Sequence, residues 1–153
     1  MDFQDSIILY ICNAKSLKMK KDIEVTKVRD VYIAAIIEIN EQLEEVWTVH
    51  VINDQEKAIE GVLVTSKGYE IEKDVQFQRS TLLRHTVGDV VAKTSAAIEM
   101  IAPEVFEIYN EYWLTFFQDG QLLEKKFTFG PYTIDKNFIT PLPAIGLKGI
   151  LIK

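Results

Sequence analysis

One stretch, Tyr109 to Phe129, constrains the fold more than any other part of the sequence: YNEYWLTFFQDGQLLEKKFTF. Asp119-Gly120 lies between two runs rich in aromatic and branched residues, which predicts a β-hairpin with a two-residue turn. Such a turn sets the register of the two strands, because the residues beside it must pair directly. Phe117 should therefore face Leu122, and the pairing should continue outward from there.

Side chains alternate between the two faces of a strand, so the two sides of this hairpin differ in character. One face is apolar apart from a single lysine and should meet a core: Tyr112, Leu114, Phe116, Leu123, Lys125, Phe127 and Phe129. The other face is mostly polar, with an apolar patch near the hairpin tip: Trp113, Phe117 and Leu122. The hairpin therefore predicts a sheet with one buried side and one side in water.

Length and composition set further limits. A chain of 153 residues is the usual size of one domain and can bury about 68–70% of its unfolded surface. The formal net charge of −6 argues against broad contact with nucleic acid, whose binding depends on lysine and arginine. Cys12 is the only cysteine, so no disulfide can form within the chain.

The apolar run Ile7–Cys12 is too short to cross a bilayer, and no basic residues precede it as in a secretory signal. By elimination, we expect a cytoplasmic protein.

The first eighteen residues differ in style from the rest. Their apolar residues fit a helix, yet Ile7–Ile11 also fits a strand. Met19-Lys20-Lys21 resembles a natural protein start. We therefore expect residues 1–18 to be an upstream extension and residues 19–153 to form the folded domain.

Strand signals follow one another after Ile23. Val31–Ile39 is apolar almost throughout, which is typical of a strand covered on both faces, although a helix has the same pattern. Trp47, Val49 and Val51 should point inward from the next strand. Further strands are predicted over residues 59–65, 75–83, 95–101 and 149–152, with turns at residues 53–54, 66–68 and 88–89. Short strands broken every roughly 8–12 residues predict an all-β fold, either a sandwich or a barrel.

Three shorter signals lie around the hairpin. Glu104–Ile108 precedes it as a loop or a helical turn, and Gly130-Pro131 should end its second strand, because proline lacks the ladder donor. Asp135 should cap a single helical turn. Pro141–Pro143 should be extended.

The residues that most often carry chemistry give weak signals here. His50 lies mid-strand and His85 follows Arg84, but neither has neighbours at the spacing of a metal site or a catalytic triad. Surface or hydrogen-bonded structural roles are the expectation for both. No G-x-S-x-G motif surrounds any serine, and Gly61–Gly68 lacks the second glycine that a phosphate loop needs before its lysine.

Two surface features could bind a partner. The apolar patch of Trp113, Phe117 and Leu122 is the best candidate, because exposed aromatic residues often anchor interfaces. The alternative is that another element covers it, either the N-terminal segment or Pro141–Pro143. Charge is also uneven, with an acidic stretch over residues 38–60 and a basic one made of Arg79, Arg84, His85 and Lys93. These stretches could bind an acidic partner or a second copy, but we favour solvated edges.

Six short motifs occur in order along the chain: Met19–Val25, Val51–Asp54, Val62–Tyr69, Leu83–His85, Thr115–Phe117 and Lys148–Leu151. On these motifs, residues 19–153 resemble an uncharacterised family of small bacterial proteins, mainly from Bacteroidetes. The resemblance implies an immunoglobulin-like β-sandwich and implies no catalytic residue. Some members carry the label of a phenylalanyl-tRNA synthetase alpha subunit. This chain is too short and too rich in strands for that catalytic domain, and it lacks the ATP-binding motifs.

We therefore expect a single antiparallel β-sandwich, immunoglobulin-like, that acts as a non-catalytic protein-interaction or ligand-binding module. A protein partner or a second copy would bind the face around Trp113, Phe117 and Leu122, with Arg84 and His85 as further candidates, or would add a strand at a sheet edge. No cofactor, metal, nucleic acid or membrane partner is expected. The alternatives are a small enzyme built on the Arg84-His85 pair and a nearby carboxylate, and an accessory protein of translation.

Overall fold

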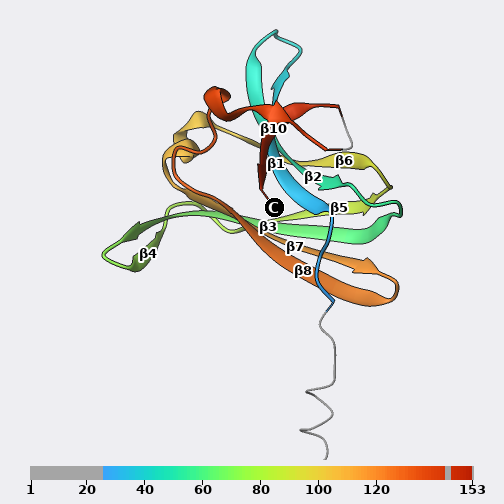
Figure 1. Ribbon diagram of the computed structural model, residues 1–153. Helices are drawn as coiled ribbons and strands as arrows, with labels where there is room; N and C mark the ends of the chain where they lie inside the picture. The colour runs from blue at the N-terminus through green and yellow to red at the C-terminus, as the bar shows by residue number, and fades with distance from the viewer. Residues whose placement is uncertain (1–25, 144–145, 153) are drawn as a thin grey trace, which may run out of the picture.

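The computed structural model describes residues 26–143 and 146–152. Along these residues run ten strands and two short 3-10 helices: β1 (Val31–Ile39), β2 (Glu45–Asn53), β3 (Ile59–Glu72), β4 (Val75–Gln78), β5 (Leu83–Val90), β6 (Thr94–Ile101), η2 (Pro103–Glu107), β7 (Tyr109–Gln118), β8 (Gln121–Phe129), η3 (Lys136–Phe138), β9 (Thr140–Pro141) and β10 (Lys148–Ile152). The strands form two antiparallel sheets that pack face to face (Figure 1), which confirms the predicted all-β sandwich. Within the described residues, no helix has the length and apolar character needed to cross a membrane.

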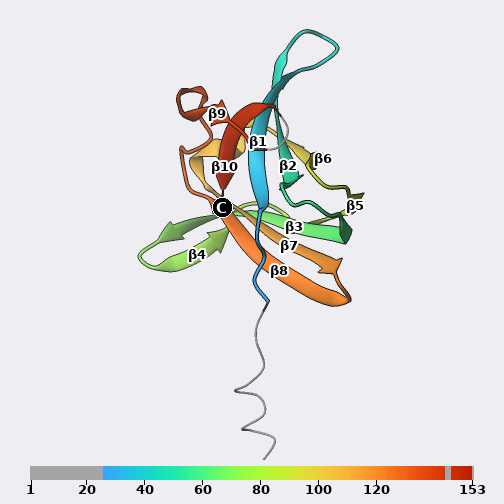
Figure 2. The same ribbon diagram turned by 45° about the vertical axis from the view of Figure 1, so that its right-hand side comes forward.

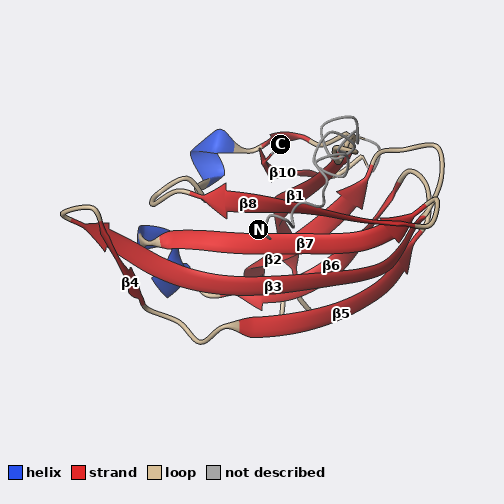
Figure 3. Ribbon diagram, turned by 90° about the horizontal axis from the view of Figure 1, so that it is seen from below, coloured by secondary structure: helices blue, strands red, loops and turns tan. Residues whose placement is uncertain are grey.

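The two sheets are named here after their central strands. The β1 sheet runs in the order β6-β2-β1-β10-β9, and the β7 sheet runs β4-β3-β7-β8, with β5 also paired to β3. One edge of β3 is shared, because β5 pairs with its first half and β4 with its last four residues. From below, β8, β7, β3 and β5 lie side by side as one broad face (Figure 3). This face is where the predicted binding patch lies.

The hairpin of β7 and β8 has the predicted turn and register. Asp119 and Gly120 both have positive φ, 54° and 74°, as the tight turn favoured in hairpins requires. Phe117 pairs with Leu122, and the pairing continues without a shift to the far ends of both strands. The predicted core face is confirmed, since its large apolar side chains are all buried: Tyr112, Leu114, Phe116, Leu123, Phe127 and Phe129.

The main core lies between the inner faces of the two sheets. From the β1 sheet it includes Trp47, Val49 and Val51, which point inward as predicted. Fully burying one large apolar side chain contributes about 1.5–3 kcal/mol, so this layer supplies most of the stabilising free energy. Besides the hairpin residues, its buried members are Val31, Ile33, Ala35, Ile59, Val62, Val64, Val90, Ile101 and Ile134.

β1 is buried on both faces over most of its length, as its continuous apolar sequence predicts. A second, smaller cluster covers its outer side and includes a residue that follows β9: Ala34, Ile36, Ile52 and Leu142. β10 approaches β1 so closely that a Cβ at Gly149 would overlap the carbonyl group of Ala35. A glycine is therefore required where these two backbones meet.

The predicted turn at Ser66–Gly68 is wrong, because β3 continues through these residues to Glu72. The turn predicted at residues 88–89 is wrong as well, because β5 continues through them to Val90. Gly68 lies within the strand and allows a close contact: a Cβ there would lie 2.7 Å from Cδ1 of Ile108. Its N–H also donates to Ser80 Oγ at 2.6 Å. A glycine inside a strand pattern can thus mark close packing as well as a turn.

The predicted strand over residues 75–83 is divided in two, because β4 ends at Gln78 and β5 begins at Leu83. Between them the N–H groups of Arg79 and Ser80 both donate to the carbonyl of Gly68, which bends the chain. The end of β3 and all of β4 form an arm that projects from the sandwich in both side views (Figures 1 and 2). All four residues of β4 and the last three of β3 are exposed, since no second layer covers them.

The shorter predicted elements are confirmed. Pro103–Glu107 forms a 3-10 helix, which decides the choice between loop and helical turn before β7. The side chain of Asp135 accepts a hydrogen bond of 2.8 Å from the N–H of Asn137 and caps η3. β8 ends before Gly130-Pro131. The extension predicted over residues 1–18 lies outside the described residues.

Candidate functional site

The outer face of the β7 sheet carries the apolar patch predicted from the hairpin. The exposed fractions are 40% for Trp113, 50% for Phe117 and 59% for Leu122. The structure adds Leu63 of β3, which is 49% exposed. Leu63 pairs with Thr115, which places it between the two aromatic side chains of β7. These residues, Leu63, Trp113, Phe117 and Leu122, are named the outer patch.

Two segments of the chain are predicted as alternatives that could cover this patch, and the structure describes only one of them. Leu142, from Pro141–Pro143, packs with Ala34 and Ile36 of the β1 sheet and not with the outer patch. The N-terminal segment up to residue 25 lies outside the described residues. The patch is therefore open to solvent within the part of the chain that the structure describes.

A shallow groove of about 140 Å³ lies beside the outer patch and includes Arg84 of β5. Arg84 pairs with Thr65, and Thr65 pairs with Trp113, so the three side chains stand in one row across β5, β3 and β7. Leu63 and Thr115 also line this groove. Among the described residues, Arg84 takes part in none of the ion pairs. The structure thus places Arg84 and Trp113 on the lining of one groove.

Charged side chains surround the patch in pairs. The carboxylate of Glu111 lies between two ammonium groups, those of Lys67 and Lys126, each at 3.9 Å. The indole N–H of Trp113 donates to Glu124 Oε2 at 3.4 Å. This contact orients the indole ring. The result is an apolar centre with a polar rim, the usual anatomy of a protein interface.

His85 lies on the opposite side of the sheet from Arg84. Its Nε2 atom lies 3.2 Å from Ser66 Oγ and 3.2 Å from Glu99 Oε1, in the space between the two sheets. Tyr112 OH donates to the other oxygen of Glu99 at 2.7 Å. Neighbouring residues of a strand point to opposite faces, so the His85 imidazole lies toward Glu99 and the Arg84 side chain lies toward the outer face. Both residues line the groove beside Trp113, so their grouping as candidate binding residues stays a prediction.

The cluster of Ser66, His85 and Glu99 contains the residue types of a catalytic triad but lacks its geometry. A triad needs the hydroxyl on one imidazole nitrogen and the carboxylate on the other, so that a proton passes through the ring. Here Ser66 and Glu99 both approach Nε2. The arrangement therefore holds a carboxylate in place and does not activate the serine.

Burial and the adjacent Glu99 carboxylate raise the pKa of Tyr112 far above its ordinary value. The largest cause is burial, since the side chain is only 1% exposed and a phenolate there would lose its hydration. The hydrogen bond to Glu99 also requires the neutral phenol as donor. Tyr112 therefore stays protonated in the folded protein at pH values where an ordinary tyrosine ionises.

Raising the pH above the ordinary tyrosine pKa of 10.0 should lower the free energy of unfolding through Tyr112. The unfolded chain then releases this proton while the folded chain keeps it, so stability falls by up to about 1.4 kcal/mol per pH unit. Below that pKa the phenol is protonated in both states and contributes no slope. Urea unfolding from about pH 8 to about pH 11 measures the effect. Tyr112→Phe should reduce the dependence of the free energy of unfolding on pH. Tyr132→Phe, at an exposed position, should leave this dependence unchanged. Equal dependence on pH in the two variants would contradict this prediction.

His50 lies on the outer face of the β1 sheet. Its Nε2 atom is 2.8 Å from Glu38 Oε2. Its Nδ1 atom is 3.5 Å from Ser95 Oγ, at the outer limit of a hydrogen bond. These contacts give His50 the hydrogen-bonded structural role that the sequence favours.

Of the basic stretch seen in the sequence, only Lys93 pairs with the acidic stretch among the described residues. Arg79 pairs with Glu70 in the projecting arm. Lys93 pairs with Asp54 and Glu56, each at 3.2 Å. With His85 inside the sandwich, only Arg84 of the basic stretch lies free at the outer face among the described residues. This supports the interpretation of both stretches as solvated edges.

The sequence pattern does not show that Ser66, Glu99 and Tyr112 form one cluster. The one local signal was Glu99 itself, a carboxylate inside the otherwise apolar strand of residues 95–101. It faces inward beside a β-bulge, where the pairing of β2 with β6 shifts register after Val49. The bulge changes the alternation of side chains, so the strand pattern alone does not reveal the direction of Glu99.

Within residues 26–143 and 146–152, no three histidine, cysteine, aspartate or glutamate side chains gather closely enough to hold a metal ion. The sequence matches no known protein-family model and no curated protein.

Proposed function

We propose that the protein is a non-catalytic protein-interaction module that binds its partner with the outer face of the β7 sheet. The outer patch carries this proposal, because it places Leu63, Trp113, Phe117 and Leu122 together on one open face. Contiguous apolar surface of this kind is unusual on a monomer and typically marks a binding site. Trp113 is its expected anchor, since tryptophan is strongly enriched among residues that dominate binding.

The face is a better site than the neighbouring sheet edge. β8 forms that edge, and it carries Glu124, Lys125 and Lys126 in succession. Lys125 points to the core side, with Nζ 5.0 Å from the centre of the Phe127 ring. Charged residues in an edge strand, above all inward-pointing ones, are a common protection against the addition of another strand. We therefore assign binding to the face.

The groove beside Trp113 favours a partner of particular chemistry. Its apolar sides suit an aliphatic or aromatic side chain, and Arg84 at one end suits a carboxylate, which guanidinium binds with two parallel hydrogen bonds. The Glu111 carboxylate is already neutralised by Lys67 and Lys126. The expected partner is a protein segment with an apolar anchor next to an aspartate or glutamate.

Photo-crosslinking in extracts of the source organism would test this proposal. A photoreactive phenylalanine analogue placed at Phe117 should crosslink a discrete protein, because that side chain lies in the outer patch. The same analogue at Phe138, 58% exposed on η3, is the matched control and should not crosslink that protein. Crosslinking at both positions alike, or at neither, would contradict the proposal.

Trp113→Ala should weaken the affinity for the crosslinked protein by tenfold or more, because hot-spot tryptophans commonly contribute over about 1.4 kcal/mol. The domain itself should lose little stability, since the indole is already 40% exposed. Biolayer interferometry gives the affinity, and urea unfolding gives the stability. Phe138→Ala should change neither. An unchanged affinity, or a severe loss of stability in Trp113→Ala, would contradict this assignment.

Three finer statements remain predictions: the immunoglobulin-like form of the sandwich, the cytoplasmic location, and the resemblance of residues 19–153 to a bacterial family. The small-enzyme alternative stays a prediction; the carboxylate nearest His85 is Glu99, whose Oε1 lies 3.2 Å from Nε2 on the inner side of the sheet. The translation alternative would require RNA binding that weakens as salt increases.

A further inference from the structure

A second cavity lies between the two sheets, on the other side of β3 from the outer patch. It has a volume of about 150 Å³ and is named the interior cleft. Ser66 of β3, Ser80 of the segment before β5, and Glu99 of β6 line it together with Leu83, Ile101 and Val105. The cleft therefore combines an apolar wall with several oxygen atoms.

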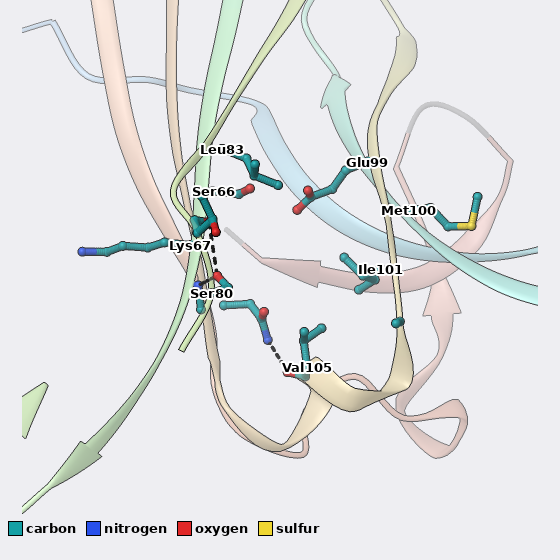
Figure 4. A pocket seen from close by; sticks show the side chains of 12 residues that line it. Ser66, Lys67, Ser80, Leu83, Glu99, Met100, Ile101 and Val105 are labelled. Atoms are coloured by element: carbon teal, nitrogen blue, oxygen red, sulfur yellow. Dashed lines mark hydrogen bonds between the residues drawn. The ribbon is translucent and has the colours of Figure 1, made fainter. Parts of the chain in front are cut away.

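Glu99 supplies the charge of the cleft. Figure 4 shows this side chain reaching from β6 toward Ser66 and Leu83 on the other side. Lys67 also belongs to the lining, but its side chain points away from the cleft (Figure 4), and its ammonium lies 3.9 Å from Glu111 on the outer face. Among the described lining residues, the carboxylate of Glu99 is thus the only charged group that points into the cleft.

The other polar groups of the cleft are mainly acceptors. Asn110, only 7% exposed, uses its amide N–H groups to donate to the carbonyls of Val105 and Ile108, at 2.7 and 3.1 Å. Its amide oxygen accepts none of the hydrogen bonds found among the described residues. Ser80 Oγ accepts from the N–H of Gly68. The acceptor oxygens of Glu99 and Asn110 therefore favour a ligand that brings donors.

Glu99 retains capacity for such a ligand. Its oxygens receive hydrogen bonds from Tyr112 OH and approach His85 Nε2, at 2.7 and 3.2 Å. A carboxylate has about four acceptor positions, so these contacts leave room for more donors. They also hold the carboxylate in one orientation, which is what a preformed site requires.

We propose that the interior cleft binds an alkylammonium group, with the ammonium at Glu99 and the carbon chain against Leu83, Ile101 and Val105. A cavity of about 150 Å³ accommodates a body of roughly six non-hydrogen atoms, the size of benzene. This is the size of a short primary amine or of the end of a lysine side chain. Both sources present the same chemistry, three N–H donors on an apolar stem.

A titration of the full-length protein with n-butylammonium chloride, followed by amide NMR shifts, tests this proposal. Saturable shifts should appear at Gly68 and Ala102, whose residues line the cleft. n-Butanol and butyrate match the carbon chain but lack the ammonium, and they should bind at least tenfold more weakly. The proposal is overturned if butylammonium gives no saturable shifts, or if butanol binds equally well.

Variants assign the effect to the cleft. Glu99→Gln keeps the shape but removes the charge, and it should weaken butylammonium binding at least tenfold. Glu124→Gln removes a carboxylate from the outer face and should leave binding unchanged. Thr81→Trp, at an exposed position of the cleft lining, should block entry without touching Glu99, so it tests the site even if Glu99→Gln does not fold. Unchanged binding in Thr81→Trp, or in a folded Glu99→Gln, would overturn the proposal.

The source of the ammonium is decided by comparing peptides. A short peptide with one unmodified lysine is titrated beside the same peptide with acetyl-lysine, which lacks the charge. Tighter binding of the unmodified peptide than of butylammonium would assign the cleft to a partner's lysine side chain. Binding of butylammonium without binding of the peptide would assign it to a free amine.

Discussion

Replacing Phe116 with alanine should lower the free energy of unfolding by about 3–5 kcal/mol, whereas the same replacement at Phe117 should cost about 1 kcal/mol or less. The two residues are neighbours in β7 and chemically identical. Phe116 is completely buried in the main core, and Phe117 is half-exposed in the outer patch. The difference arises because the alanine at Phe116 leaves a cavity that the surrounding sheets fill only partly.

Urea unfolding followed by tryptophan fluorescence measures both free energies, since Trp47 and Trp113 report on the two sheets. Phe117→Ala is the matched control for Phe116→Ala, because the two residues have the same strand propensity and lie at nearly the same distance from the turn. Similar losses in Phe116→Ala and Phe117→Ala would show that the two faces of the hairpin are not as described. The outer patch would then lose its basis as well.

Asn53→Ala should be the most costly replacement of a polar side chain, with an expected loss of about 2–4 kcal/mol. Asn53 is fully buried at the end of β2. Its amide group donates to the carbonyls of Lys57, Val90 and Val91 at 2.9, 3.0 and 3.2 Å. Alanine would leave these carbonyls without a donor in a place that water reaches poorly.

The position of Asn53 explains why so small a side chain should matter. β2 belongs to the β1 sheet and Val90 ends β5 of the β7 sheet, so this amide joins the two layers at one edge. Asp54→Ala is the matched control at the next residue. Asp54 pairs with Lys93 near the surface, and such pairs contribute about 1 kcal/mol or less. Equal losses in the two variants, measured by urea unfolding, would contradict the role assigned to Asn53.

Asn53 also shows what local sequence patterns miss. The sequence predicts a turn at Asn53-Asp54, and the chain does turn there after β2. The buried hydrogen bonds of Asn53 depend on Val90, a residue 37 positions later. Local preference for turns is the same whether the amide meets water or another sheet. Only the packing of the two layers distinguishes these cases.

The errors in strand boundaries have the same origin. Gly68 is a turn residue by local propensity, yet it lies inside β3 because it pairs with Asn110 of β7. Likewise, the predicted strand over residues 75–83 is interrupted because the N–H groups of Arg79 and Ser80 donate to the carbonyl of Gly68. Contacts between distant segments overrode local preference in both places.

The sequence by itself determined the β-hairpin of residues 109–129, its register, and which side chains face the core. The turn at Asp119-Gly120 needs positive φ at both residues, and the two-residue period of a strand then assigns every side chain to a face. Tertiary structure alone decided that Leu63 joins the outer patch and that Ser66, His85, Glu99 and Tyr112 meet between the sheets. These residues come from β3, β5, β6 and β7, and their meeting depends on how the strands are ordered and where β6 bulges. No local backbone preference encodes that order, because it results from the joint packing of the whole sandwich.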